Sequence, residues 1–215
     1  ALFDAEGNLV ANAPHMPVHL GSMGESIKTV VKKNAGRIRP GDVFALNDPY
    51  NGGTHLPDVT VVMPVFGPEP QDPARGEILF YVAARGHHAD IGGITPGSMP
   101  PGSRSLEEEG VLIDNFKLVE GGRLREKELL ELLAGARYPA RNPEQNIADL
   151  RAQIAACEKG REELEKLVSH FGLEQVRAYM GHVQDNAEES VRRAITALKD
   201  GEFTYAMDSG AEIKV

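Results

Sequence analysis

The chain has 215 residues, of which 41% are hydrophobic and 26% are charged, and its formal net charge is −9. Such a chain can bury a sizeable core in one large domain or two small ones, and its acidity argues against nucleic acid as a partner. It contains no run of about 18 to 20 apolar residues, so no membrane association is expected. Cys157 is its only cysteine, which excludes an internal disulfide and predicts a reducing, cytoplasmic setting.

The first elements predicted along the chain are a hairpin and a helix. Residues 1–12 alternate weakly between apolar and polar side chains around a glycine-containing turn, which indicates a short β-hairpin. Ser22 and Glu25 have the spacing of a capping box, in which each side chain satisfies a free backbone N–H at the start of a helix. We therefore expect a helix that begins at Ser22 and ends at Gly36.

Three β-strands are predicted next, separated by two loops. Val43–Leu46 is a short strand, and Val59–Phe66 and Ile78–Ala84 are longer runs of β-branched and aromatic residues. Asn47–Asp58, with the sequence NDPYNGGTHLPD, joins the first two strands. The Pro-rich segment Gly67–Gly76 joins the last two, as expected for an exposed hairpin loop.

This strand order predicts that polar side chains meet at one edge of the sheet. In an antiparallel pair, the start of one strand lies beside the end of the next. His55 and Asp58 precede the first long strand, and His87 follows the second in the segment RGHHADIGG. We therefore expect these three side chains to lie close together although they are distant in the sequence.

The second half of the chain changes to helical patterns. After a Gly/Pro/Ser-rich loop and predicted short strands at Val111–Ile113 and Phe116–Val119, Glu126–Gly135 has a helical apolar pattern. Residues 145–171 and 173–198 carry apolar residues at steps of three and four and are joined at a glycine, which predicts an antiparallel helical hairpin. The predicted fold class is α+β: a β-rich region over residues 1–124 with a loop-borne metal site, then a mainly helical region over residues 125–215.

His55 and Asp58 form an HxxD pair, which can point an imidazole and a carboxylate at one ion such as Zn²⁺ or Mn²⁺. HxxD is also common in ordinary loops, where Asp58 would cap a turn and His55 would be a polar surface residue. His87 adds a third candidate ligand at the same edge of the sheet, which favours the metal interpretation. Three protein ligands with an open position are typical of a catalytic metal site.

Two further residues of the RGHHADIGG segment have candidate roles. Neighbouring residues of a strand point to opposite faces, so His87 and His88 cannot both be ligands if the strand continues. We take His87 as the ligand and His88 as a catalytic proton carrier or substrate contact. Asp90 either orients one of the imidazoles or forms a turn before two glycines.

Other polar residues admit both a functional and an ordinary interpretation. Glu107–Glu109 is either a solvated acidic run or a crowded cluster in which Glu108 acts as a catalytic general acid or base. His15 and His19 lie in a loop-like segment, and either could line a pocket. Cys157 lies on an apolar helix stripe and is interpreted as a core residue. The sequence contains neither GxGxxG nor GxxxxGK[ST], so no ATP site is placed on this chain.

Four long motifs follow one another in the chain: ALFDAEGNLVANAPHMPVHLGSM, GDVFALNDPYNGGTHLPDVTVVMPVF, RGHHADIGGITPGSMPP and EEEGVLIDNFKLVEGG. Together they resemble the hydantoinase B/5-oxoprolinase family over nearly the whole chain. The resemblance implies the ring-opening, hydrolytic half of an ATP-coupled cyclic amidase for substrates such as hydantoin and 5-oxoproline. It also implies a divalent metal, Zn or Mn, held by His55, Asp58 and a histidine of RGHHAD.

The resemblance implies partners as well. ATP would bind a hydantoinase A-type subunit or domain that phosphorylates the substrate oxygen, and the assembly would be oligomeric. Family members are longer and use a further aspartate from a segment just upstream of ALFD. We therefore expect this chain to be a fragment of a longer polypeptide.

Two alternatives share most of these observations. Family relatives that carboxylate ketones imply a component of an ATP-dependent ketone carboxylase, with the same metal site and a different substrate. In the other alternative, the chain is a non-catalytic assembly module. Its helical hairpin, residues 145–198, would dock the hydantoinase A-type partner, and its His/Asp loops would be structural.

Overall fold

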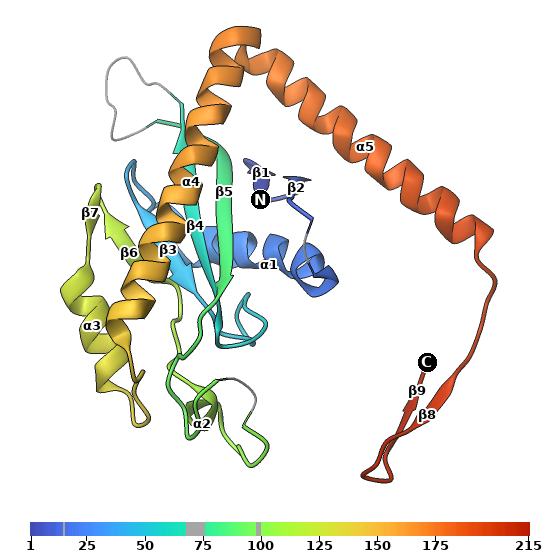
Figure 1. The fold of residues 1–215 in the computed structure, drawn as a ribbon. Helices are drawn as coiled ribbons and strands as arrows, with labels where there is room; N and C mark the ends of the chain where they lie inside the picture. Colours follow the sequence, from blue (N-terminus) through green and yellow to red (C-terminus); the bar gives the residue numbers. More distant parts are fainter. Residues whose placement is uncertain (15, 68–75, 98–99) are drawn as a thin grey trace.

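The computed structural model describes residues 1–14, 16–67, 76–97 and 100–215. Within these ranges, one antiparallel sheet contains β1 (Leu2–Asp4), β2 (Leu9–Ala11), β3 (Val43–Leu46), β4 (Asp58–Phe66), β5 (Ile78–His87), β6 (Phe116–Glu120) and β7 (Arg123–Leu124). Its strand order is β2-β1-β5-β4-β3-β6-β7, so β4 and β5 lie near its centre (Figure 1). The hairpin predicted for residues 1–12 is confirmed as β1–β2. Residues 68–75 of the predicted hairpin loop lie outside the described residues.

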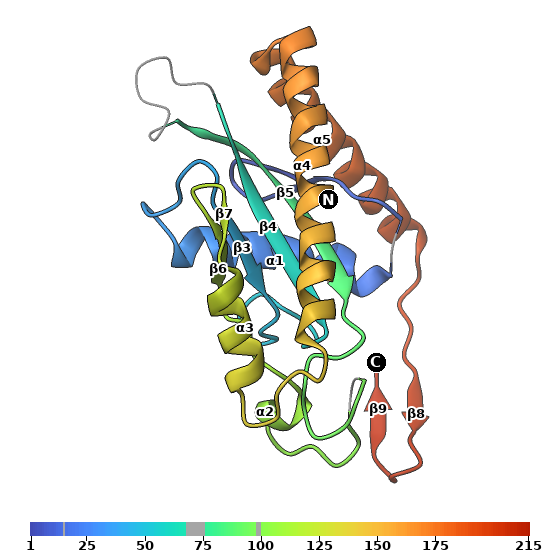
Figure 2. The ribbon, with the colours of Figure 1, turned by 60° about the vertical axis from the view of Figure 1, so that its left-hand side comes forward.

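Helices cover both faces of this sheet. The remaining elements of the described part are α1 (Pro17–Lys33), α2 (Leu106–Glu109), α3 (Glu126–Gly135), α4 (Pro143–Phe171), α5 (Leu173–Ala197), β8 (Thr204–Ala206) and β9 (Glu212–Lys214). α1 lies against one face of the sheet, and α3 and α4 lie against the other (Figures 1 and 2). The long strands therefore sit in the middle of a three-layer arrangement.

Burial on both faces explains the continuous apolar runs in β4 and β5. Val61 packs in the core beneath α4, together with Leu150 and Cys157 of that helix. Val62, the next residue of β4, points to the opposite face and packs with Ile27 of α1. Because both faces of these strands are covered by helices, the strands lack the apolar–polar alternation of a half-exposed strand. The interpretation of Cys157 as a core residue is confirmed.

The start of α1 differs from the prediction. α1 begins at Pro17, so the capping box predicted at Ser22 is wrong, and it ends at Lys33 rather than Gly36. Proline has the fixed φ that the first helical position needs and lacks the N–H that would be unpaired there. Ser22 lies inside the helix, where its hydroxyl donates to the Val18 carbonyl oxygen at 2.8 Å.

Val111–Ile113, predicted as a short strand, is not a strand in the structure. The Val111 N–H donates to the Ile91 carbonyl oxygen at 2.8 Å, and the Asn47 N–H donates to the Ile113 carbonyl oxygen at 2.9 Å. Bonds to two different segments replace the ladder that a strand would form. This stretch instead connects the loops at one end of the sheet.

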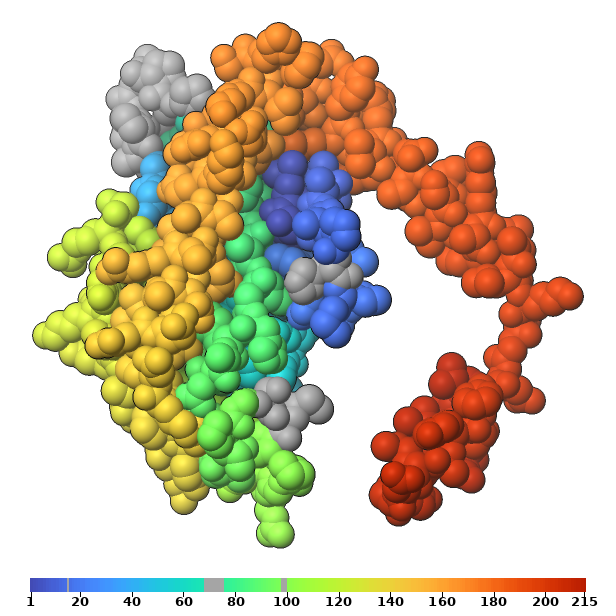
Figure 3. Space-filling view, viewed as in Figure 1, coloured from blue at the N-terminus to red at the C-terminus, as the bar shows by residue number. Residues whose placement is uncertain are grey.

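The two long helices join at Gly172, whose φ of +84° is readily adopted by glycine. α4 runs along the sheet, whereas α5 leaves it obliquely from the joint (Figure 1) and buries Val176 and Met180. The β8–β9 hairpin is exposed throughout and stands away from the body across open space (Figure 3). The predicted α+β class, with a sheet in the first half followed by two long helices in contact, is confirmed.

The core crosses the boundary between the two regions distinguished in the sequence. Side chains of α3 and α4 belong to the same hydrophobic cluster as those of the sheet, so these helices do not form a core of their own. The division at residue 124 stays a prediction. No helix in the described ranges has both the length and the apolar character that a membrane span requires.

Candidate metal centre

A tight turn places His55 and Asp58 together at the start of β4. The Asp58 N–H donates to the His55 carbonyl oxygen at 2.9 Å, which closes a four-residue turn over HLPD. Leu56 is buried in the core, and the Pro57 carbonyl oxygen accepts from the His88 N–H at 2.8 Å. The turn is therefore fixed both to the core and to the chain that follows β5.

The ladder between β4 and β5 brings His87 to the same place. Asp58 and His87 are direct register partners, so the predicted meeting of the two segments is observed. These two residues lie at strand ends rather than in loops, because both strands are longer than expected. His87 Nδ1 lies 2.8 Å from Asp58 Oδ1, and His55 Nδ1 lies 3.7 Å from Asp58 Oδ2.

His55, Asp58 and His87, hereafter the trio, fit one divalent cation. One potential ligand atom from each side chain lies within 4.8 Å of the other two. Two imidazole nitrogens and one carboxylate oxygen suit Zn²⁺ or Mn²⁺. The Asp58 side chain is 11% exposed and the His87 side chain is 54% exposed, so the trio has a side that a water molecule or substrate can reach.

Asn47 ties the loop that carries His55 to the neighbouring extended segment. Its side chain is buried, and Nδ2 donates to the carbonyl oxygens of Leu56 at 2.8 Å and Val111 at 2.9 Å. Its Oδ1 accepts from the Ile113 N–H at 2.6 Å. Because one buried amide makes all three bonds, the loop and this segment are held at a fixed separation.

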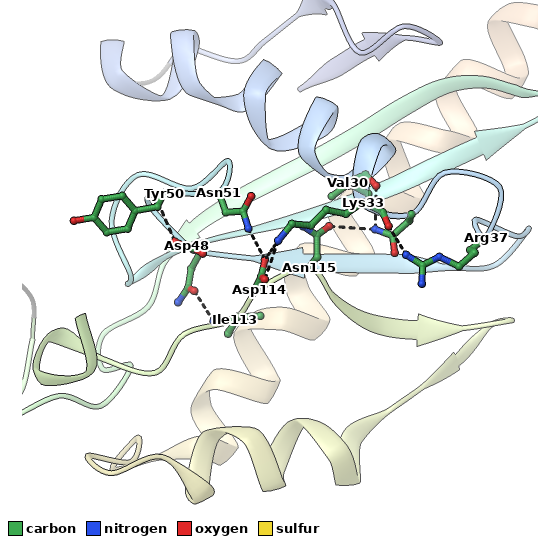
Figure 4. Close-up of polar contacts among 11 residues, drawn as sticks. Val30, Lys33, Arg37, Asp48, Tyr50, Asn51, Ile113, Asp114 and Asn115 are labelled. Carbon is green, nitrogen blue, oxygen red and sulfur yellow. Dashed lines mark hydrogen bonds and ion pairs between the residues drawn. The ribbon is translucent and has the colours of Figure 1, made fainter. Parts of the chain in front are cut away.

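The outer part of the same loop is fastened to α1. Asp114 accepts from Lys33 Nζ of α1 at 2.7 Å and from Asn51 Nδ2 of the loop at 3.1 Å (Figure 4). Gly52 has a φ of +89°, and a Cβ there would lie 2.7 Å from Thr29 Oγ1 of α1. The loop thus approaches the helix so closely that a side chain at this position would not fit.

His88 points to the opposite face of the sheet from the trio and is buried against α4. Asn146 Nδ2 of α4 donates to His88 Nδ1 at 2.9 Å, which leaves the ring proton on Nε2, 3.2 Å from Gln153 Oε1. Burial lowers the pKa of the His88 imidazole, and the Gln153 hydrogen bond opposes this shift. Both ring nitrogens are engaged in holding α4 to the end of β5.

Two other sequence candidates lie outside the trio. Both Asp90 carboxylate oxygens accept from Arg141, Oδ1 at 2.7 Å from the guanidinium and Oδ2 at 2.8 Å from the backbone N–H. Glu108 lies on α2, and its Oε2 accepts from the Arg104 N–H at 2.6 Å. The catalytic roles of His88 and Glu108 stay predictions, and each would require a structural hydrogen bond to be given up.

Arg85 was not singled out by sequence reasoning, although it lies on the same face of β5 as His87. Its guanidinium is half-buried between β4 and α1, where it contacts His19 Nδ1 at 3.1 Å. Burial lowers the pKa of Arg85, and the negative charge of Asp58 opposes the shift, so the two groups interact electrostatically. The sequence did hold a signal for Arg85: it lies two residues before His87, and side chains two residues apart on a strand point to the same face. His15 lies outside the described residues.

The fold and the trio define an α+β protein with a candidate metal centre at a strand end. The family model described as hydantoinase B/oxoprolinase matches residues 1–215. The chain therefore belongs to the hydantoinase B/oxoprolinase family.

Individual relatives agree with this assignment. The chain is 48% identical over 192 residues to a 5-oxoprolinase of Dictyostelium discoideum, covering 89% of this chain and 14% of that protein. The crystal structure of an ATP-dependent caprolactamase from Pseudomonas jessenii superposes with a TM-score of 0.81 and 32% identity, covering 96% of this chain and 34% of that one. A nucleotide-free acetone carboxylase structure gives a TM-score of 0.70 and 27% identity, covering 83% and 22%. The chain thus spans a small part of its relatives' length.

Proposed function

We propose that this chain is the metal-dependent, ring-opening part of an ATP-coupled cyclic amidase that acts on hydantoin- or 5-oxoproline-like substrates. The observation that carries the proposal is the trio, with two imidazoles and one carboxylate converging at the solvent-facing end of a rigid ladder. The relative at 48% identity is a 5-oxoprolinase, which favours a cyclic amide as the substrate class.

The trio has the features that such a reaction requires. His55, Asp58 and His87 would hold the ion, which when bound supplies Lewis acidity to an amide carbonyl and a source of hydroxide near neutral pH. Asp58 contacts both imidazoles and is the least exposed of the three side chains, so it fixes their mutual orientation. The exposed His87 leaves the substrate side of the site open.

ATP is proposed to act through a partner of the hydantoinase A type. A related protein that is 33% identical over 95% of this chain is named as the beta subunit of a caprolactamase, which supports a multi-subunit assembly. The sequence of this chain carries no phosphate-binding glycine motif, so the nucleotide is assigned to the partner subunit or domain.

Metal analysis of the full-length protein tests the site. His55→Ala and Asp58→Ala should each abolish stoichiometric Zn²⁺ or Mn²⁺ binding, because each removes one of three ligands. The chain offers a matched control in His182 and Asp185, a second HxxD pair that lies exposed on α5. His182→Ala and Asp185→Ala should retain the metal. Unchanged metal content in both trio variants would reject the site.

A substrate panel separates the proposed reaction from its alternatives. ATP turnover by the assembled enzyme should rise with 5-oxoproline or hydantoin and not with acetone. Stimulation by acetone alone would favour a ketone carboxylase component, the alternative that the acetone carboxylase likeness supports. Activity that survives loss of the trio, with the complex intact, would favour a non-catalytic assembly module.

A further inference from the structure

Arg85 occupies a position directly beside the trio. It lies two residues before His87 on β5, and its register partner Thr60 lies two residues after Asp58 on β4. Side chains two residues apart on a strand share a face, so these four side chains all point toward α1. Arg85 Nε donates to Thr60 Oγ1 at 2.7 Å, which links the two strands at this point.

The rest of the guanidinium contacts one face of α1. Nη1 donates to Ser22 Oγ at 2.6 Å and contacts His19, and Nη2 donates to Ser26 Oγ at 2.9 Å. The three contacted helix residues are spaced by three and four positions, so they lie along a single stripe of α1. One planar side chain therefore joins β4, β5 and two turns of α1.

The contact continues from α1 into the loop that carries His55. Ser26 is fully buried, and its hydroxyl donates to the carbonyl oxygen of Gly52. Gly52 lies three residues before His55, where the loop approaches α1 closely. A path of hydrogen bonds thus runs from Arg85 through Ser26 to the His55 loop.

Only a guanidinium can make this set of contacts. Throughout the described ranges, no carboxylate lies within ion-pair distance of Arg85, and its hydrogen-bond partners are hydroxyls and an imidazole. A half-buried cation that makes no direct ion pair is costly, so its charge alone is a poor reason for its presence. A fixed plane of N–H donors pointing in several directions is a property that lysine lacks.

We propose that Arg85 is a positioning residue of the metal centre. Through Ser26 and Gly52, it holds the His55 loop at the separation from β4 and β5 at which His55 meets Asp58 and His87. This proposal rests on the proposed function in one respect, since it takes the trio as the metal site.

Metal affinity and loop protection together test the proposal. In the full-length protein, Arg85→Lys keeps the charge and loses the planar fork, whereas Ser26→Ala keeps Arg85 and cuts the link to Gly52. Each should weaken Zn²⁺ affinity by about 10- to 100-fold, as for other residues that orient metal ligands. Each should also speed amide hydrogen exchange over residues 47–57 in the metal-free protein and alter the visible spectrum of bound Co²⁺.

The variants also distinguish positioning from charge. The nearby positive charge of Arg85 by itself opposes a cation, so a purely electrostatic role predicts tighter Zn²⁺ binding by Arg85→Gln and unchanged binding by Arg85→Lys. Positioning predicts weaker binding by both. The double variant Arg85→Lys with Ser26→Ala should be little worse than either single variant, because both interrupt one path.

Controls keep the outcomes separate. Arg123→Lys and Ser190→Ala, at exposed positions on β7 and α5, should change neither affinity nor exchange. Wild-type Zn²⁺ affinity together with wild-type exchange in Ser26→Ala and Arg85→Lys would overturn the proposal. Failure of the wild-type protein to bind any metal would instead overturn the proposed function. The exchange data from the metal-free protein would still report whether Arg85 holds the loop.

Discussion

His87 and His88 are adjacent in the sequence and lie in opposite surroundings. His87 points toward the α1 face, where its side chain is 54% exposed and contacts Asp58. His88 points toward the α4 face, where it is 2% exposed and both ring nitrogens are bonded to amide side chains. At this end of the β4–β5 ladder, the α1 face is thus open to solvent and rich in ligand atoms, and we call it the open face. The α4 face is covered by the helix, and we call it the sealed face.

This difference shows how a rigid site can be exposed on one side. The amides of Asn146 and Gln153 bond to His88, which attaches α4 to the residue that directly follows His87, the last residue of β5. Gln153 Nε2 also donates to the carbonyl oxygens of Val59 at 2.8 Å and Ala84 at 3.0 Å, which ties both strands to the helix. The contacts on the α4 face thus hold in place the strand ends that carry Asp58 and His87 on the α1 face.

Replacing the two histidines separately should give opposite patterns, with stability reduced in one variant and metal binding lost in the other. His88→Ala should lower the free energy of unfolding by about 2 to 4 kcal/mol, because it leaves a cavity and unpaired buried amides. His87→Ala should abolish metal binding and change the metal-free stability by less than about 0.5 kcal/mol, since its side chain is exposed. Urea unfolding of the metal-free proteins and metal analysis of the loaded ones measure the two quantities.

Only this combination of results would show that His88 has a structural role and His87 a metal-binding role. Comparable loss of stability in both variants would mean that His87 also belongs to the structural network. Loss of metal in a folded His88→Ala protein would mean that the sealed face controls the site more directly than its contacts indicate.

Gly53→Ala should displace the loop that carries His55 on the open face. A Cβ at Gly53 would overlap the backbone carbonyl of Asn47, which cannot move without breaking the bonds that hold the loop. We expect a loss of about 1 to 3 kcal/mol in stability and weaker metal binding. Gly102→Ala is the matched control, because a Cβ there would meet no atom within 4 Å. Equal thermal stability and metal affinity of the two variants would contradict the close packing of the loop.

The smallest effect is expected at Cys157, on the sealed face. Burial raises the pKa of this thiol to about 12, and the thiolate is the reactive form. Because the shift favours the neutral thiol, iodoacetamide at pH 8 should leave the folded protein almost unmodified. In urea it should add one equivalent, since the chain has a single cysteine. Similar labelling rates in both conditions would show that the α4 face opens readily.

Local patterns in the sequence were enough to predict the strands of the ladder and the meeting of the trio. Both follow from chain order, because an antiparallel connection between β4 and β5 necessarily places Asp58 near His87. Glu126–Gly135 was likewise predicted with its observed bounds, since its apolar spacing and end signals are local.

The remaining features depend on contacts between distant segments. The role of Asn47 comes from bonds to Val111 and Ile113, in one segment more than sixty positions away, and nothing in its own neighbourhood indicates them. The start of α1 was misplaced because Ser22, which fits a capping pattern, is used instead to contact Arg85. Val176 and Met180 of α5 pack into the same core as α4, and apolar periodicity alone does not predict that α5 departs obliquely.

The only register irregularity between β4 and β5 in the described residues falls between Val65 and Phe66, at the end of the ladder farthest from the trio. Every pair from Asp58–His87 to Val65–Phe80 is regular, and the Gly67 N–H closes the far end by donating to the Glu77 carbonyl oxygen at 2.9 Å. An insertion between Gly67 and Gly76 would therefore be absorbed there without shifting which residue faces Asp58. This connection is therefore suited to the insertion of a tag or reporter, which should leave the pairing of Asp58 with His87 unchanged.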